Sequence, residues 1–272
     1  MKIIVDAQAL QTDSKYRGIG NYVKNLLDSL FYHNDHSYVL LFNESLSTQD
    51  EKKSLQNYYE KFSSVKKIIF FKVIEKVNNK NTQDLNYILR EHLVARLKPD
   101  LVFITSLFEG IYDKAVLSVN KYFKNIPHAI LCYDLIPYFF SRDNFRYIND
   151  ANSNMYQEKL NYLKDSKLIF TISEHSKNHI ANFVDRSRIY NIDAALPNHF
   201  LEQKIDPNFL KRKRISNKYF LIVGGGDQRK NYGYMIKAFS DLPAEYKKNY
   251  SIFLLEKLTN KLKKPYLILL FH

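Results

Sequence analysis

Short apolar runs alternate with longer segments of helical periodicity along most of this sequence, and this alternation strongly limits how the chain can fold. Apolar residues recur at helical spacing in Ile19 to Leu30, Gln49 to Phe62, Asp84 to Leu97 and Asn152 to Leu163. Strands that alternate with helices usually form a parallel sheet buried on both faces. The pattern therefore predicts an α/β fold with a doubly wound parallel sheet. The predicted strands are Lys2 to Asp6, Tyr38 to Phe42, Ile68 to Val73, Leu101 to Ile104, Ala129 to Tyr133, Lys167 to Ile172 and Arg188 to Ile192.

The alternation stops near Ala195, which predicts a domain boundary. After it the hydrophobic period is lost, and prolines together with a basic run indicate an exposed linker. A strand over Tyr219 to Val223 and a helix over Tyr232 to Phe239 then begin a new unit. We predict a complete Rossmann-like domain over residues 1–195, a linker over 196–218, and an incomplete second Rossmann-like domain over 219–272.

The cysteine content and the apolar runs indicate a cellular compartment. The one cysteine, Cys132, excludes an internal disulfide and a multi-cysteine zinc cage, so the cytosol is the expected location. The apolar run near the N-terminus is too short for a signal peptide. No segment approaches the roughly 20 uninterrupted apolar residues that a membrane span needs.

Two glycine-containing loops follow predicted strands and open predicted helices. The first contains Gly18 and Gly20, where bare backbone allows close approach of a ligand and helix amides favour an anion. A strand-to-helix turn also needs glycine for its geometry alone. The second runs from Gly224 to Asn231, where Arg229 and Lys230 add full positive charges that suit a diphosphate. A solvated helix start with two surface cations is the alternative interpretation of this second loop.

Asp134 follows the predicted strand Ala129 to Tyr133, at the carboxyl end where open parallel sheets place their ligands. A carboxylate at this point can orient a hydroxyl or accept a proton. Its alternative role is to cap the turn before Pro137.

Ser173 is predicted to cap a helix that runs to about Phe183, because its hydroxyl can accept from an unpaired amide of the first turn. Ser173 and His175 are close together in the sequence, on this one helix, and lack the glycines that flank a nucleophilic serine in hydrolases. Hydrolase chemistry is therefore not expected. The histidines show no metal-ligand spacing, and no metal site is predicted.

Four segments, taken in order, resemble one enzyme family. They are Gln11 to Tyr22 (QTDSKYRGIGNY), Tyr133 to Pro137 (YDLIP), Leu168 to Lys177 (LIFTISEHSK) and Ile222 to Asn231 (IVGGGDQRKN). Their order and separations resemble glycosyltransferase family 4, of the GT-B fold, over nearly the whole chain. The likeness is closest to bacterial members associated with lipopolysaccharide and capsule polysaccharides.

The resemblance implies two facing Rossmann-like domains, with the acceptor held mainly by the first and the nucleotide-sugar donor by the second. It further implies a hexosyltransferase-like reaction with a glycan or lipid-linked acceptor and retention at the anomeric carbon, without a metal or other cofactor. By motif position, Gly18 and Gly20 would approach the donor phosphates, and Arg229 and Lys230 would hold the diphosphate. Asp134 would lie beside the transferred sugar.

The sequence departs from the family at two points. Many members have histidine where Tyr133 stands. The family's second domain also continues beyond the position of His272 and carries a glutamate pair that holds the donor sugar and ribose, to which Glu256 does not belong. We therefore expect a chain truncated in its donor domain, with impaired activity.

Three functions are compatible with the sequence. The first is a glycosyltransferase of surface-polysaccharide synthesis, peripheral at the inner membrane face, where the net charge of +13 would favour anionic lipid. The second is a non-catalytic binding subunit or relic whose donor half comes from another chain. The third is a nucleic-acid-binding protein, which rests only on the charge and the run Lys211 to Arg214. Because no nucleic-acid motif accompanies them, a nucleic-acid partner is not expected.

Overall fold

The structure is a computed structural model that describes residues 1–32, 35–74, 80–140, 150–195, 206, 208–212, 215–216, 218–223, 230–256 and 267–271. The chain divides into two compact units, Met1–Pro197 and Asn198–His272. Each unit has a β-sheet of its own, the first with seven strands and the second with three.

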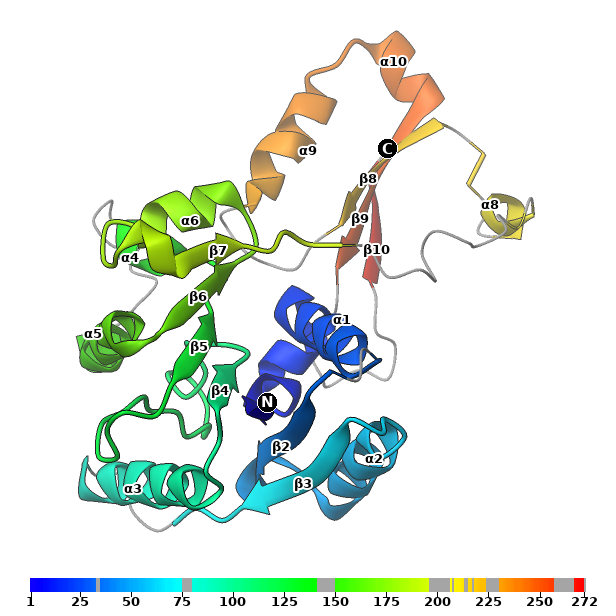
Figure 1. The fold of residues 1–272 in the computed structure, drawn as a ribbon. Coiled ribbons are helices and arrows are strands. Elements are labelled where there is room, and N and C mark those ends of the chain that lie inside the picture. The colour runs from blue at the N-terminus through cyan, green and yellow to red at the C-terminus, as the bar shows by residue number, and fades with distance from the viewer. Residues whose placement is uncertain are drawn as a thin grey trace. The chain divides into compact units, whose positions relative to one another are not determined.

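Every strand pair of the first sheet is parallel, and the strand order is β3-β2-β1-β4-β5-β6-β7 (Figure 1). This confirms the doubly wound arrangement, because the chain moves outward from β1 on one side and from β4 on the other. The strands are β1 (Lys2–Asp6), β2 (Ser37–Asn43), β3 (Val65–Phe71), β4 (Leu101–Ile104), β5 (His128–Leu131), β6 (Leu168–Thr171) and β7 (Ile189–Asn191). Each predicted strand is present, although β3 ends before Val73 and β5 before Tyr133.

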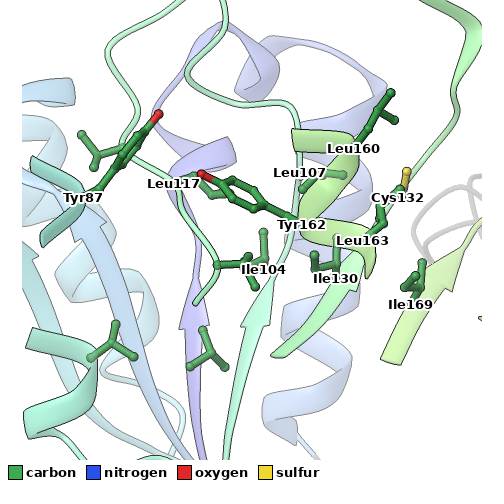
Figure 2. Close-up of a cluster of buried hydrophobic side chains, with 14 of the residues drawn as sticks. Tyr87, Ile104, Leu107, Leu117, Ile130, Cys132, Leu160, Tyr162, Leu163 and Ile169 are labelled. Atoms are coloured by element: carbon green, nitrogen blue, oxygen red, sulfur yellow. The ribbon is translucent and has the colours of Figure 1, made fainter. Parts of the chain in front are cut away.

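Helices cover both faces of this sheet (Figure 1). They are α1 (Gly18–Tyr32), α2 (Gln49–Tyr59), α3 (Lys80–Arg96), α4 (Ile136–Phe140), α5 (Asp150–Asp165) and α6 (Glu174–Ile180). Neighbouring strand residues point to opposite faces, so that Ile3 and Val5 belong to one apolar cluster and Ile4 to the other. The cluster of Ile3 and Val5 takes in side chains of α1 and α2, and the cluster of Ile4 takes in side chains of α3, α5 and α6. Figure 2 shows the second cluster around Ile104, Ile130 and Leu163.

The connection between β4 and β5, residues 105–127, contains no regular helix or strand. Side chains from the surrounding elements bind its backbone instead: Gln8 Nε2 donates to the Val116 carbonyl at 2.8 Å, and the Val116 amide donates back to Gln8 Oε1 at 2.9 Å. Lys159 of α5 donates to the Leu117 carbonyl at 2.9 Å. Buried backbone groups need such partners, so these polar side chains fix the connection in one conformation.

Arg90 and Glu91, which are adjacent on α3, hold two further points of the same connection. Arg90 Nη1 donates to the Ser118 carbonyl at 3.0 Å, and the Glu91 carboxylate accepts from the amides of Lys121, Tyr122 and Phe123 at 2.7–3.0 Å. Burial acts to raise the pKa of Glu91, but the hydrogen bonds that its carboxylate accepts, these amide bonds among them, lower the pKa.

Helix α6 begins as the sequence predicts, at Ser173. Its side-chain oxygen accepts from the Ser176 amide at 3.1 Å, which satisfies one free donor of the first turn. The helix ends at Ile180, earlier than the predicted end near Phe183.

Ser173→Ala should lower the free energy of unfolding of the first unit by about 1 kcal/mol, because the Ser176 amide loses its partner. Denaturation followed by far-ultraviolet circular dichroism measures the change. Ser54→Ala is the matched control, since this exposed serine lies inside α2 and alanine is the better helix former. Equal stability of the two variants would contradict the cap.

The second unit has a three-stranded sheet in the order β10-β9-β8, made of β8 (Lys218–Val223), β9 (Tyr250–Glu256) and β10 (Leu267–Phe271). Its helices are α8 (Phe209–Arg212), α9 (Tyr232–Ser240) and α10 (Ala244–Asn249). Strands β8 and β9 are parallel and joined through α9 and α10, as in a Rossmann-like unit. Strand β10 runs antiparallel to β9, which the sequence pattern did not predict. The intervening segment 257–266 is shorter than the roughly dozen residues that a parallel crossover needs.

Part of the predicted linker forms helix α8, where Phe209 and Leu210 are exposed. Residues 196–205 of that linker lie outside the described residues.

Candidate functional site

The first sheet places its candidate site at the carboxyl ends of β1 and β4, the neighbouring strands at which the chain changes direction across the sheet. Ligands of open α/β sheets bind in the crevice at such a switch point, outside the carboxyl ends of the strands. Three segments leave the sheet near this edge: one after β1, one after β4 and one after β5. Their side chains and backbone form the candidate site.

The segment after β1 forms a 3₁₀ turn, Asp13–Tyr16, directly before α1. Thr12 begins this turn, and its hydroxyl oxygen accepts from the Ser14 amide at 3.3 Å. The Arg17 amide donates to the Ser14 carbonyl at 2.9 Å, and the Asn21 amide donates to the Arg17 carbonyl at 3.3 Å. These bonds connect the turn to the first residues of α1 without a break.

Gly18 and Gly20, both predicted to approach donor phosphates, have different surroundings in the structure. A Cβ atom at Gly20 would lie 2.4 Å from Lys15 Cα and 2.5 Å from the Ser14 carbonyl oxygen. A Cβ atom at Gly18 would meet nothing within 4 Å, and Gly18 is exposed. Gly20 is thus required by the packing of α1 on the 3₁₀ turn, whereas Gly18 leaves open space at the helix start.

Glu109, in the segment after β4, was not predicted from the sequence. It is 5% exposed, and its carboxylate accepts from the hydroxyls of Thr12 at 2.6 Å, Ser14 at 2.7 Å and Ser106 at 2.9 Å. Burial raises the pKa of this carboxyl group, although the three hydroxyl bonds act in the opposite direction. The signal that could have indicated it is an acidic residue directly after the apolar pair Leu107 and Phe108, shortly beyond a strand end.

Asp134 lies after β5, as predicted, and its Oδ1 accepts from the Ile136 amide at 3.0 Å. This bond caps the start of α4, which is the structural role that the sequence left open for it. The structure therefore shows Asp134 in a cap at the carboxyl end of the sheet, and its relation to a transferred sugar stays a prediction.

Tyr133 connects the segments that leave three strands. Its hydroxyl donates to the Thr105 carbonyl at 3.2 Å, its own carbonyl accepts from the Ser176 hydroxyl at 2.7 Å, and its ring meets Tyr22 edge-on with centroids 5.6 Å apart. Burial raises the pKa of Tyr133 well above its usual range, so the hydroxyl keeps its proton near neutral pH. At the position where many members of the resembled family have histidine, this chain therefore has a neutral hydrogen-bond donor.

In the second unit only one residue of the predicted diphosphate site, Lys230, lies within the described residues. Arg229 and the glycines Gly224 to Gly226 lie outside the described residues. Lys230 is exposed and lies two residues before α9, at the edge of an open groove of about 810 Å³. The groove is lined mainly by apolar residues of β8 and α9, among them Phe220 and Met235.

Two absences hold for the part of the chain that the structure describes. No group of three or more histidine, cysteine, aspartate or glutamate side chains is placed to hold a metal ion. No helix in the same part is long and apolar enough to pass through a membrane. Metal independence of the reaction stays a prediction.

Comparison with known proteins finds that parts of two bacterial mannosyltransferases are similar to this chain. It is 26% identical to the serotype-specific mannosyltransferase WbdA of Escherichia coli, in an alignment that covers 94% of this chain and 32% of the relative. It is 30% identical to a second Escherichia coli WbdA sequence over 179 residues, which are 62% of this chain and 21% of the relative. The chain thus spans about a third of the length of the curated relatives it matches, or less. No protein-family model matches the sequence.

Among solved structures, the fold is similar to that of Anabaena Alr3699/HepE, which was crystallised in complex with UDP and glucose. The TM-score is 0.60 at 13% sequence identity, and the match covers 96% of this chain and 62% of that one. Together with the seven-stranded parallel sheet, this likeness confirms the fold class expected from the sequence, an α/β fold of GT-B type.

Proposed function

We propose that this chain is a glycosyltransferase, or a part of one, that transfers a sugar from a nucleotide-sugar donor to a glycan or lipid-linked acceptor of a surface polysaccharide. The observation that carries the proposal is the similarity to a serotype-specific mannosyltransferase over 94% of the chain. The fold supports it, because the similar solved protein binds UDP and glucose.

In this proposal the first unit holds the acceptor mainly through the segments after β1, β4 and β5. Asp134 uses Oδ1 to cap α4, and we assign its Oδ2 to the transferred sugar, where a carboxylate can orient a hydroxyl. Gly18 offers an exposed backbone without a side chain at the start of a 15-residue helix, which suits an anionic group of the donor. The second unit holds the donor diphosphate through Arg229 and Lys230.

The finer parts of the proposal follow the family resemblance. They are membership of glycosyltransferase family 4, retention at the anomeric carbon, independence of a metal, and a cytoplasmic location with peripheral contact to the anionic inner membrane face. The net charge of +13 supports the membrane contact. Mannose is the first donor sugar to test, because the similar Escherichia coli proteins are mannosyltransferases.

A panel of nucleotide sugars tests this function directly. The full chain is titrated calorimetrically with GDP-mannose, UDP-glucose and related donors, and each donor is then incubated with polysaccharide and lipid-linked acceptors. Binding of one donor is the expected result, with transfer of its sugar at a strongly reduced rate. Absence of binding to every donor would refute the proposal, and donor binding without transfer would limit the chain to a binding subunit.

Lys230→Ala should weaken binding of the preferred nucleotide sugar by about tenfold to a hundredfold, since charge-assisted hydrogen bonds to phosphate contribute roughly 1.5–3 kcal/mol. Calorimetric titration measures the dissociation constant. Lys237→Ala is the matched control, because Lys237 is exposed on α9 beyond the proposed diphosphate site. If both variants bind the donor as the wild-type chain does, Lys230 is only a surface cation before the helix.

A further inference from the structure

We infer that Glu109 is a positioning residue of the proposed site: its buried carboxylate, bound by three hydroxyls, fixes the first turn of α1. This inference rests on the proposed function, in which that helix start faces the donor. It assigns Glu109 a role through the backbone that it holds, without contact between its side chain and a substrate.

The contacts of Glu109 join the segments after two neighbouring strands. Ser106 belongs to the same segment as Glu109, whereas Thr12 and Ser14 belong to the segment after β1. Both carboxylate oxygens are used, because Oε2 accepts from Thr12 while Oε1 accepts from Ser14 and Ser106. The carboxylate therefore holds the 3₁₀ turn at its capping residue, Thr12, and at Ser14, near the carboxyl edge of the sheet.

The position of this turn determines the position of α1. The missing side chain of Gly20 lets the helix lie directly on the backbone of Ser14 and Lys15. The Arg17 amide is bonded to the Ser14 carbonyl, and the Asn21 amide to the Arg17 carbonyl. A displacement of Ser14 is thus transmitted through backbone contacts to the exposed backbone at Gly18.

The segment that carries Glu109 is anchored without it. Its backbone carbonyls accept from other side chains: Val116 from Gln8, Leu117 from Lys159 and Ser118 from Arg90. The amides of residues 121–123 donate to Glu91. Loss of the Glu109 charge therefore leaves the β4–β5 connection in place and releases only the turn before α1. This separation makes the inference testable in a folded protein.

A carboxylate is the group that can accept from three hydroxyls at once. Glutamine keeps the size of the side chain but has one carbonyl oxygen, and its amide nitrogen donates and does not accept. Glu109→Gln should therefore break or reverse at least one of the three hydroxyl bonds while it preserves the packing.

Amide hydrogen exchange of the full ¹⁵N-labelled chain, followed by NMR, reports this change. In Glu109→Gln the amides of Arg17 and Asn21 should exchange about tenfold to a hundredfold faster than in the wild type, since hydrogen bonds to a charged group contribute about 1.5–3 kcal/mol. Glu91→Gln is the matched control, because it also removes a buried carboxylate that anchors the same connection. The control should accelerate exchange at residues 121–123 and leave Arg17 and Asn21 unchanged.

The pH dependence provides a second readout. Burial and the nearby Asp113 carboxylate raise the pKa of Glu109, and Tyr133 also interacts with it electrostatically. In the wild type, exchange of Arg17 and Asn21, corrected for the intrinsic rate, should accelerate as acidification protonates Glu109. Glu109→Gln should lack this acceleration.

Unchanged exchange at Arg17 and Asn21 in Glu109→Gln would overturn the inference, as would an equal effect of Glu91→Gln. If Glu109→Gln does not fold, Ser106→Ala removes one hydroxyl donor and should shift the same two amides in the same direction by a smaller factor. No shift in that variant would also overturn it. Failure of the proposed function is read separately, as absence of GDP-mannose and UDP-glucose binding by the wild-type chain.

Discussion

Arg90→Leu is expected to lower the free energy of unfolding of the first unit by about 3–5 kcal/mol. The side chain is fully buried, and its Nε and Nη2 donate to Asp6 Oδ2 at 2.9 and 2.5 Å. Leucine removes the only cation that is paired with Asp6 among the described residues. The Asp6 carboxylate then still accepts from the backbone amide and side-chain amide of Gln8, but these donors are uncharged. It also removes the partner of the Ser118 carbonyl. A buried charge without its counter-charge is the main cause of the large expected loss.

Native-state hydrogen exchange of the amides in β1 and β4 measures this loss within the first unit alone. Arg186→Leu is the matched control, because Arg186 and Glu174 form an ion pair at 3.8 Å in which both side chains are more than half exposed. Exposed pairs contribute at most about 1 kcal/mol, so the control should change stability little. A loss for Arg90→Leu no larger than that of the control would contradict the assigned role of the buried pair.

The elements of the first unit could be predicted because their signals are local. A strand buried on both faces leaves a short apolar run, as in Leu101–Ile104, and a helix leaves a 3.6-residue period, as in α1. The serine cap of α6 is equally local, since Ser173 and Ser176 are three residues apart. The pattern placed the end of one helix too late, because α6 ends at Ile180 and not near Phe183.

The polar contacts that fix the candidate site could not be predicted, because they join residues far apart in the sequence. Asp6 and Arg90 are 84 residues apart, and Thr12 and Glu109 are 97 apart. On α3, an arginine next to a glutamate is typical of a solvated helix face, yet Arg90 and Glu91 are both buried. Charge and spacing contain no information about which distant backbone carbonyl or amide needs a partner.

The sequence predicted where the segments of the candidate site leave the sheet, but it did not predict the contacts that each residue makes there. Asp134 lies at the predicted strand end, but its described bond is to the amide of Ile136, within its own segment. Gly20 was predicted in a loop but lies in the first turn of α1, where the backbone beneath it is the reason for glycine. A loop motif predicts where the chain turns, whereas tertiary contacts determine the role of each glycine or carboxylate in that turn.

Gly20→Ala should therefore destabilise the first unit by about 3 kcal/mol, at the upper end of the usual cost of overpacking. The added methyl group would lie 2.4 Å from Lys15 Cα and 2.5 Å from the Ser14 carbonyl oxygen. Both are backbone atoms, which cannot move aside as a flexible side chain does. The 3₁₀ turn or α1 has to shift, and exchange of the Arg17 and Asn21 amides should accelerate with it.

Gly18→Ala separates this packing effect from the proposed contact with the donor. Its methyl group would meet nothing within 4 Å, and alanine favours the helix by up to about 1 kcal/mol, so stability should stay equal or rise slightly. Donor binding should nevertheless weaken in calorimetric titrations with the preferred nucleotide sugar, because the methyl group occupies the space left for a phosphate. Gly20→Ala should lose both stability and donor binding. If Gly20→Ala is as stable as the wild type, the packing argument is wrong. If Gly18→Ala binds the donor as the wild type does, the start of α1 is not part of the proposed donor site.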